Sequence, residues 1–365
     1  MTKSCNLKGQ QKLFFLHLNQ ATSCCRASPV SLDHNLPLLH YLDHWKKERS
    51  QLAQGIEIES CQHCWKDEQR GATSYRQQLD NINTDHVEIF ANNLCNQMCS
   101  YCSPKFSSQW QDSIEQQGKF QGISATASNN LEIVPANNKT DYWIDQLAQY
   151  LSQCSDNSVS VKLLGGEPLM QKQNLQQLLE LNSNRVSKLV INTNLNPPSN
   201  RFLDWVLERF PRDKLQFEIS LDASPEYNAV PRAGFDCNRF YHNLELLKQH
   251  QIEFVFLSVV SVLSVFDIEN FQLWLEANQY TARFFNLNNP DCLDSKYLPN
   301  EVKTSLWKDS LPNVVKESLT SSNLVDLKLF EQYNYLKQYF DRTNVEYMQN
   351  LKFASYWNWL TERYK

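Results

Sequence analysis

Hydrophobic residues follow two alternating patterns from residue 87 onward. Short apolar or β-branched runs, typical of buried strands, alternate with longer stretches in which apolar residues recur at helical spacing. The runs predict strands at 87–91, 159–164, 188–194, 215–222, 253–262 and 282–287, and the amphipathic stretches predict helices at 142–154, 174–181, 200–210, 239–250 and 268–277. Such alternation is typical of a parallel sheet, and six strands predict a partial (β/α)6 barrel.

The two ends of the chain have different patterns. The first 80 residues are rich in cysteine and loops, with one predicted helix at 38–54, whereas three helices are predicted after residue 299, at 301–319, 325–339 and 352–364. We therefore expect an α/β protein in three parts. These are a small cysteine-rich module at 1–82, the partial barrel at 83–290 and a helical region at 291–365.

Composition and charge narrow the class of protein. With 365 residues, 41% apolar and 21% charged, the chain matches a globular protein of one large and one smaller domain. The net charge is −5 and the basic residues are scattered, so we expect no nucleic-acid partner. An early apolar run at 13–16 ends at His17, too soon for a signal peptide, and no run approaches the roughly 20 apolar residues that span a bilayer. We expect a cytoplasmic protein with no membrane partner.

Eleven cysteines are the most informative feature of the composition. In a reducing compartment, clustered cysteines are more often metal ligands than disulfides. Cys95-x3-Cys99-x2-Cys102 offers three thiolates directly after the first predicted strand. A cubane cluster has four irons, so three ligands leave one iron open. A zinc site completed by a distant residue is the alternative.

Other conspicuous residues also follow predicted strands. Loops at the carboxyl ends of barrel strands converge on one face and carry the chemistry. The segment Gly165-Gly166-Glu167-Pro168 follows the second strand, Asn194 ends the third and Asp222 ends the fourth. On its own the Gly-Gly-Glu-Pro segment is also compatible with an ordinary strand-to-helix turn.

Together the triad and these segments resemble the radical S-adenosylmethionine superfamily over roughly residues 83–290. The resemblance implies a catalytic [4Fe-4S] cluster on Cys95, Cys99 and Cys102, with S-adenosylmethionine chelating the open iron. Its reductive cleavage would give a 5′-deoxyadenosyl radical that abstracts a substrate hydrogen, with electrons from a reductase, flavodoxin or ferredoxin.

The resemblance also implies cofactor-binding residues. Gly165, Gly166, Glu167 and Pro168 match the motif that contacts the methionine amino group. Ser220 and Asp222 match residues that reach the nucleoside, and Arg232 matches an arginine that pairs with the methionyl carboxylate. Tyr101 and Asn194 complete the expected set. Each of three residues also has a structural alternative. Asp222 could cap a helix, Arg232 could lie on a solvated surface, and Asn194 could form hydrogen bonds within the core.

The amino-terminal cysteines suggest a second cofactor. Cys5, the Cys24-Cys25 pair and Cys61-x2-Cys64 could supply four thiolates, enough to close an auxiliary [4Fe-4S] cluster. The region resembles the auxiliary-cluster modules called SPASM and twitch, although those modules usually follow the barrel. A structural zinc site and unliganded buried cysteines are the alternatives, and the sequence does not select between Cys24 and Cys25.

Two functional classes follow from these observations. The first is a radical enzyme that modifies a peptide or a small metabolite, with peptide preferred by the same resemblance. Cys292, just beyond the sixth predicted strand, is its candidate hydrogen-atom donor, and a plain loop cysteine is the alternative. The second class is a non-catalytic zinc or iron–sulfur binding module that contacts partners.

Overall fold

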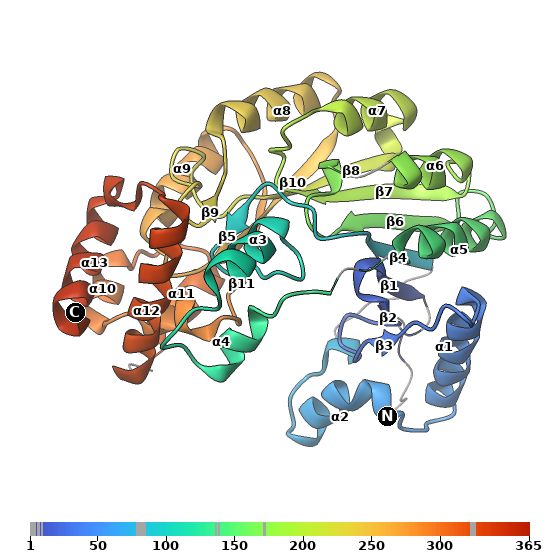
Figure 1. Ribbon diagram of the computed structural model, residues 1–365, viewed down its shortest axis with the longest axis horizontal. Helices are drawn as coiled ribbons and strands as arrows, with labels where there is room; N and C mark the ends of the chain where they lie inside the picture. The colour runs from blue at the N-terminus through green and yellow to red at the C-terminus, as the bar shows by residue number, and fades with distance from the viewer. Residues whose placement is uncertain are drawn as a thin grey trace. The chain divides into compact units, whose positions relative to one another are not determined.

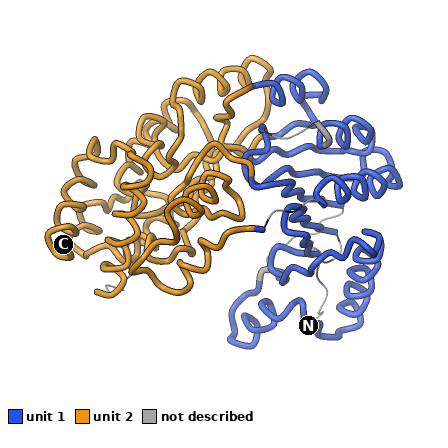
Figure 2. The backbone as a smooth tube through the Cα atoms, viewed as in Figure 1, with its two compact units in different colours: residues 1–93, 135–192, 200–216 blue, residues 94–134, 193–199, 217–365 orange. Residues whose placement is uncertain are grey.

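A computed structural model describes residues 5, 8, 10–77, 85–135, 137, 139–170, 173–321 and 326–365. The described chain is a mixed α/β fold with parallel strands and many helices (Figure 1). It divides into two compact units, coloured in Figure 2: unit 1 holds residues 1–93, 135–192 and 200–216, and unit 2 holds 94–134, 193–199 and 217–365. No helix within the described ranges is long and apolar enough to cross a membrane.

Unit 1 contains a sheet with strand order β7-β6-β4-β1-β2-β3. Strands β1, β4, β6 and β7 pair in parallel, and β2 and β3 add antiparallel edges. Along β6, Val159, Val161 and Leu163 are buried and alternate with half-buried residues, as expected for a strand with one face on the core. The strands are β1 Gln11–Phe15, β2 Gln20–Thr22, β3 Val30–Ser31, β4 Asp85–Phe90, β6 Val159–Leu164 and β7 Val186–Thr193.

Helices of unit 1 pack on one another. Helix α5 packs against α6 and α1 (Figure 1). The buried residues of α5 include Trp143 and Leu147. The helices are α1 Leu38–Ala53, α2 Gln62–Gln69, α5 Thr140–Ser152, α6 Gln173–Leu181 and α7 Arg201–Arg209.

Unit 2 contains the strand order β11-β10-β8, with β10 and β11 parallel, and a separate antiparallel pair formed by β5 and β9. Its core is aromatic, with Phe217, Phe240, Phe256 and Phe271 fully buried. The strands are β5 Met98–Cys99, β8 Leu215–Ser220, β9 Arg232–Ala233, β10 Glu253–Val260 and β11 Ala282–Asn286. The helices are α3 Ser108–Gln117, α4 Ala125–Asn130, α8 Cys237–Gln249, α9 Ile268–Ala277, α10 Asn300–Leu306, α11 Asn313–Thr320, α12 Asp326–Thr343 and α13 Leu351–Tyr364.

The six predicted strands are all present, as β4, β6, β7, β8, β10 and β11, and so are the five helices predicted between them. The helix predicted at 301–319 is in fact two helices, α10 and α11, because Pro312 has no N–H to continue a helix and starts a new one. Residue 325, the predicted start of the next helix, lies outside the described residues. The sequence analysis predicted no strand before residue 87, yet β1 pairs with β4. The division at 82 and 290 stays a prediction.

Candidate functional site

The cysteine triad lies in a buried loop of unit 2. Cys95 and Cys99 are buried, Cys102 is half-buried, and all three are free thiols. Cys99 ends strand β5, whose antiparallel pairing with β9 sets Cys99 directly opposite Arg232. The short sheet therefore fixes one predicted cluster ligand against one predicted cofactor-binding residue.

Arg232 links the triad to Asp222 and Tyr101. Its Nε donates to Asp222 Oδ2 at 2.8 Å, its Nη1 donates to Cys99 Sγ at 3.5 Å, and its Nη2 donates to the Tyr101 hydroxyl. The guanidinium also lies 5.6 Å from the centre of the Tyr101 ring. The structure thus brings together four residues that the sequence analysis assigned to the cluster and its cofactor.

Asp222 is fully buried, and its carboxylate accepts hydrogen bonds from three neighbours. Besides Arg232, Tyr101 OH donates to Oδ2 at 2.7 Å, and the backbone N–H of Val259 donates to Oδ1 at 2.8 Å. The carboxylate balances the charge of Arg232, whose side chain is itself only 8% exposed. A buried ion pair of this kind holds its members in one geometry, because separating them leaves an uncompensated charge.

Three aromatic side chains donate hydrogen bonds to the backbone of the triad loop, and two of them, Tyr335 and Tyr339, lie 235 and 241 positions away from their partners in the sequence. Trp110 Nε1 donates to the Cys99 carbonyl at 2.8 Å, Tyr335 OH donates to the Ser100 carbonyl at 2.8 Å, and Tyr339 OH donates to the Met98 carbonyl at 3.2 Å. All three side chains are fully buried. The sequence analysis missed them, because only their burial, and no local motif, connects them to the triad.

Gly234 allows a close backbone approach beside the triad. Its φ is +92°, and a Cβ there would lie 2.6 Å from the carbonyl oxygen of Asn96, which directly follows Cys95. A side chain would therefore push on the loop backbone as well as strain its own conformation.

We expect Gly234→Ala to lower the free energy of unfolding by about 2 kcal/mol, because both strain and the clash contribute. Gly71→Ala is the matched control, since Gly71 also has a positive φ, +78°, at the end of a helix, but a Cβ there meets nothing within 4 Å. It should cost about 1 kcal/mol. Urea unfolding of both variants makes the comparison, and equal losses would contradict a role for the close approach.

Burial favours the protonated thiols of Cys99 and Cys102 when no metal is bound. Burial raises the pKa of Cys99, although the Arg232 guanidinium opposes the rise, and burial raises the pKa of Cys102 to about 12. Because metals bind thiolates, loading this site must release protons.

Asn194 ends one predicted strand, and Ser220 is the last residue of the observed strand β8. Asn194 is buried, and its Nδ2 donates to Asn96 Oδ1 at 3.1 Å in the triad loop. Asn96 in turn donates to the Asn196 carbonyl at 2.7 Å. Asn194 thus supports the triad loop, while Ser220 is half-buried at the end of β8.

The Gly-Gly-Glu-Pro segment lies in unit 1, after β6. Gly165 has φ +79°, and a Cβ there would lie 3.0 Å from Phe90 Cβ, so glycine lets this turn approach the end of β4. Gly166 also has a positive φ. Glu167 is buried and its Oε1 accepts from the Leu169 backbone N–H at 2.9 Å, so it caps the short helix that Pro168 begins.

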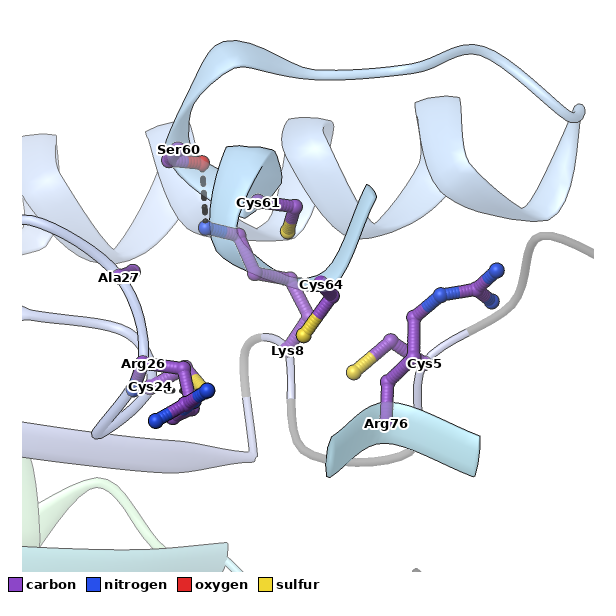
Figure 3. A pocket seen from close by; sticks show the side chains of 9 residues that line it. All are labelled: Cys5, Lys8, Cys24, Arg26, Ala27, Ser60, Cys61, Cys64 and Arg76. Carbon is purple, nitrogen blue, oxygen red and sulfur yellow. Dashed lines mark hydrogen bonds between the residues drawn. The ribbon is translucent and has the colours of Figure 1, made fainter. Parts of the chain in front are cut away.

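Four of the amino-terminal cysteines line one pocket of unit 1 (Figure 3). Cys5 comes from the start of the chain, Cys24 from the loop after β2, Cys61 from the short 3-10 helix before α2, and Cys64 from the first turn of α2. Burial raises the pKa of Cys61 to about 11, and the electrostatic influence of Cys5, Cys24 and Cys64 on this thiol adds to the rise. The fold therefore brings these four cysteines, which are far apart in the sequence, to one pocket.

Backbone N–H groups and buried cations surround these thiols. Arg26 N–H donates to Cys24 Sγ at 3.4 Å, and Arg76 N–H donates to Cys64. Lys8, 1% exposed, pairs with Glu48 at 2.8 Å. Burial raises the pKa of Cys61 and Cys64 by more than these N–H groups and the Lys8 cation lower it, so the donors offset only part of the rise.

The pocket distinguishes the two adjacent cysteines. Cys24 lines it and is buried, whereas Cys25 is exposed and does not line it.

Cys292 lies elsewhere, in unit 2, and is fully buried after β11, with its carbonyl accepting from Gln332 Nε2 at 2.6 Å. Its role as a hydrogen-atom donor stays a prediction, and a substrate could reach its thiol only after the surrounding segment opened.

Within the described ranges, no group of three or more His, Cys, Asp or Glu side chains is arranged to hold a metal ion. Metal binding at either cysteine set thus requires side chains to turn toward a common centre. Zinc draws its ligands to about 2.3 Å from one ion, whereas each thiolate of a cubane binds a different iron. A cubane therefore needs less convergence of the thiols than zinc does.

Comparisons with known proteins give distant structural likenesses. They include histidine-tagged anSMEcpe with bound AdoMet, with a TM-score of 0.41 and 18% identity over 70% of this chain and 57% of that chain. Streptococcus suis SuiB bound to precursor peptide SuiA has a TM-score of 0.38 and 15% identity over 86% of this chain and 54% of that chain. No family model and no curated protein matches. The proposed function rests on the residues of this chain.

Proposed function

We propose that this chain is a radical S-adenosylmethionine enzyme whose catalytic [4Fe-4S] cluster binds to Cys95, Cys99 and Cys102. The observation that carries the proposal is the buried triad loop, in which Arg232 Nη1 donates to Cys99 Sγ at 3.5 Å and aromatic hydroxyls hold the backbone. Hydrogen-bond donors to a thiolate are the surroundings that an anionic cluster requires. When bound, the cluster supplies an electron to S-adenosylmethionine.

The residues of the chain have distinct parts in this proposal. Arg232 neutralises negative charge beside Cys99, and Asp222 and Tyr101 fix the plane of its guanidinium. Nη1 has a second N–H that can donate to a carboxylate of the bound nucleotide. The resemblance implies that Gly165, Gly166, Glu167 and Pro168 would contact the amino group of that nucleotide and that Asn194 and Ser220 would line its site.

A second [4Fe-4S] cluster in the pocket of Cys5, Cys24, Cys61 and Cys64 is part of the same proposal. Four thiolates would leave no iron open, so this cluster would serve electron transfer or structure. The substrate would be a peptide or a small metabolite, and a flavodoxin or ferredoxin would supply the electron.

Metal analysis tests the proposal. Protein purified without oxygen should contain about eight irons and about eight sulfides per chain, because two cubanes hold that number. About four irons would limit the proposal to one cluster. Stoichiometric zinc with no iron would favour the non-catalytic metal-binding module instead.

Adjacent cysteines provide a matched test of the second cluster. Cys24→Ala removes a buried thiol from the pocket, so we expect iron to fall from about eight to about four per chain. Cys25→Ala removes the exposed neighbour and should leave the iron content unchanged. Equal iron in the two variants would contradict the assignment of Cys24 as a ligand.

A further inference from the structure

Two buried polar groups lie between the cysteines of the triad without a partner among the described residues. They are Nε2 of Gln97 and Oγ of Ser100. Gln97 is 1% exposed and Ser100 is fully buried, so bulk water does not reach them. A buried donor without an acceptor costs about 1–3 kcal/mol, and such groups in a native protein point to a partner that binds there.

Gln97 is held close to two of the three thiols. Its backbone N–H donates to Cys95 Sγ at 3.4 Å, and the Ser107 hydroxyl donates to its carbonyl at 2.7 Å. Its side-chain Oε1 accepts from the Cys99 thiol at 3.8 Å. The carboxamide is thus anchored beside Cys99.

When Cys99 binds iron, the carboxamide of Gln97 must change from accepting a hydrogen bond to donating one. A cluster-bound Cys99 is a thiolate, which has no proton to give to Oε1. The contact survives only if the carboxamide presents an N–H to sulfur, and Nε2 is the group that has no other partner among the described residues. The Ser100 hydroxyl also carries a proton that it can donate. It lies in the same loop, one residue after Cys99.

We propose that Gln97 Nε2 and Ser100 Oγ donate hydrogen bonds to the sulfur atoms of the catalytic cluster and thereby raise its reduction potential. This inference rests on the proposed function. Hydrogen bonds to cluster sulfurs are one of the factors that set the potential. A donor stabilises the reduced state more than the oxidised state, because the reduced cluster carries more negative charge on its sulfurs.

A redox titration followed by electron paramagnetic resonance tests the inference. The signal to titrate is the one that changes on addition of S-adenosylmethionine, which identifies the catalytic cluster. Gln97→Met keeps the length of the side chain without an N–H, and Ser100→Ala removes the hydroxyl. Each variant should shift the midpoint to a more negative potential, and a tenfold loss in the reduction equilibrium would be about 59 mV for one electron.

Thr361→Ala in helix α13 is the matched control, since the Thr361 hydroxyl is also buried without a partner among the described residues but lies far from the triad in the sequence. Its midpoint should equal that of the unmodified protein. Unchanged midpoints in both loop variants, or an equal shift in the Thr361 variant, would overturn the inference. Absence of iron from the unmodified protein would instead overturn the proposed function.

Discussion

Replacement of Cys99 by Ala should abolish cleavage of S-adenosylmethionine. On the proposed function, the variant would remove one of three ligands to the catalytic cluster, and two thiolates would not retain it. Release of 5′-deoxyadenosine by the reduced protein should fall by at least about a thousandfold, equivalent to about 4 kcal/mol of activation free energy. Chromatographic measurement of methionine and 5′-deoxyadenosine gives the rate.

Cys237→Ala is the control for the loss of a thiol. Cys237 is half-buried at the first position of helix α8, outside both cysteine sets. This variant should cleave the nucleotide at the unmodified rate. Both variants should keep the far-ultraviolet circular dichroism of the parent, because unit 2 has an aromatic core independent of these thiols. Undiminished cleavage by the Cys99 variant would contradict the assignment of the triad.

Replacement of Asp222 by Asn should destabilise the protein by about 3–5 kcal/mol, because it leaves Arg232 buried without a counter-charge. The new amide would also direct an N–H toward donors, since Tyr101, Val259 and Arg232 all donate to the present carboxylate. Urea unfolding of the metal-free protein measures the loss.

An exposed ion pair gives the matched control for Asp222. Asp326 pairs with Arg363 at 3.0 Å, with the side chains 70% and 47% exposed, respectively. Solvent screens such a pair, so Asp326→Asn should cost about 1 kcal/mol or less. If the two variants lost the same stability, the buried pair would not hold the site together as described.

The local parts of the site were predictable from the sequence. Apolar runs located all six predicted strands, and the spacing of Cys95, Cys99 and Cys102 located the triad in the loop after β4. Asp222 and Arg232 were predicted to serve one cofactor, and the structure pairs them. Such features depend on periodicity and short-range spacing, which a sequence displays directly.

The long-range parts were not predictable. Tyr335 contacts Ser100 across 235 positions, and nothing in the local pattern of helix α12 indicates that partner. The need for Gly234 follows from the approach of the Asn96 backbone, which exists only in the folded chain. Cys24 and Cys25 have identical side chains, and only the fold turns one into the pocket and the other outward.

The most direct test is electron–nuclear double resonance of the reduced protein with S-adenosylmethionine carrying ¹⁵N in its methionyl amino group. Three cysteine ligands would leave one iron open, so we expect a hyperfine coupling between this nitrogen and the cluster in the unmodified protein. A reduced cluster with the labelled nucleotide bound but no such coupling would contradict the assignment of the open iron.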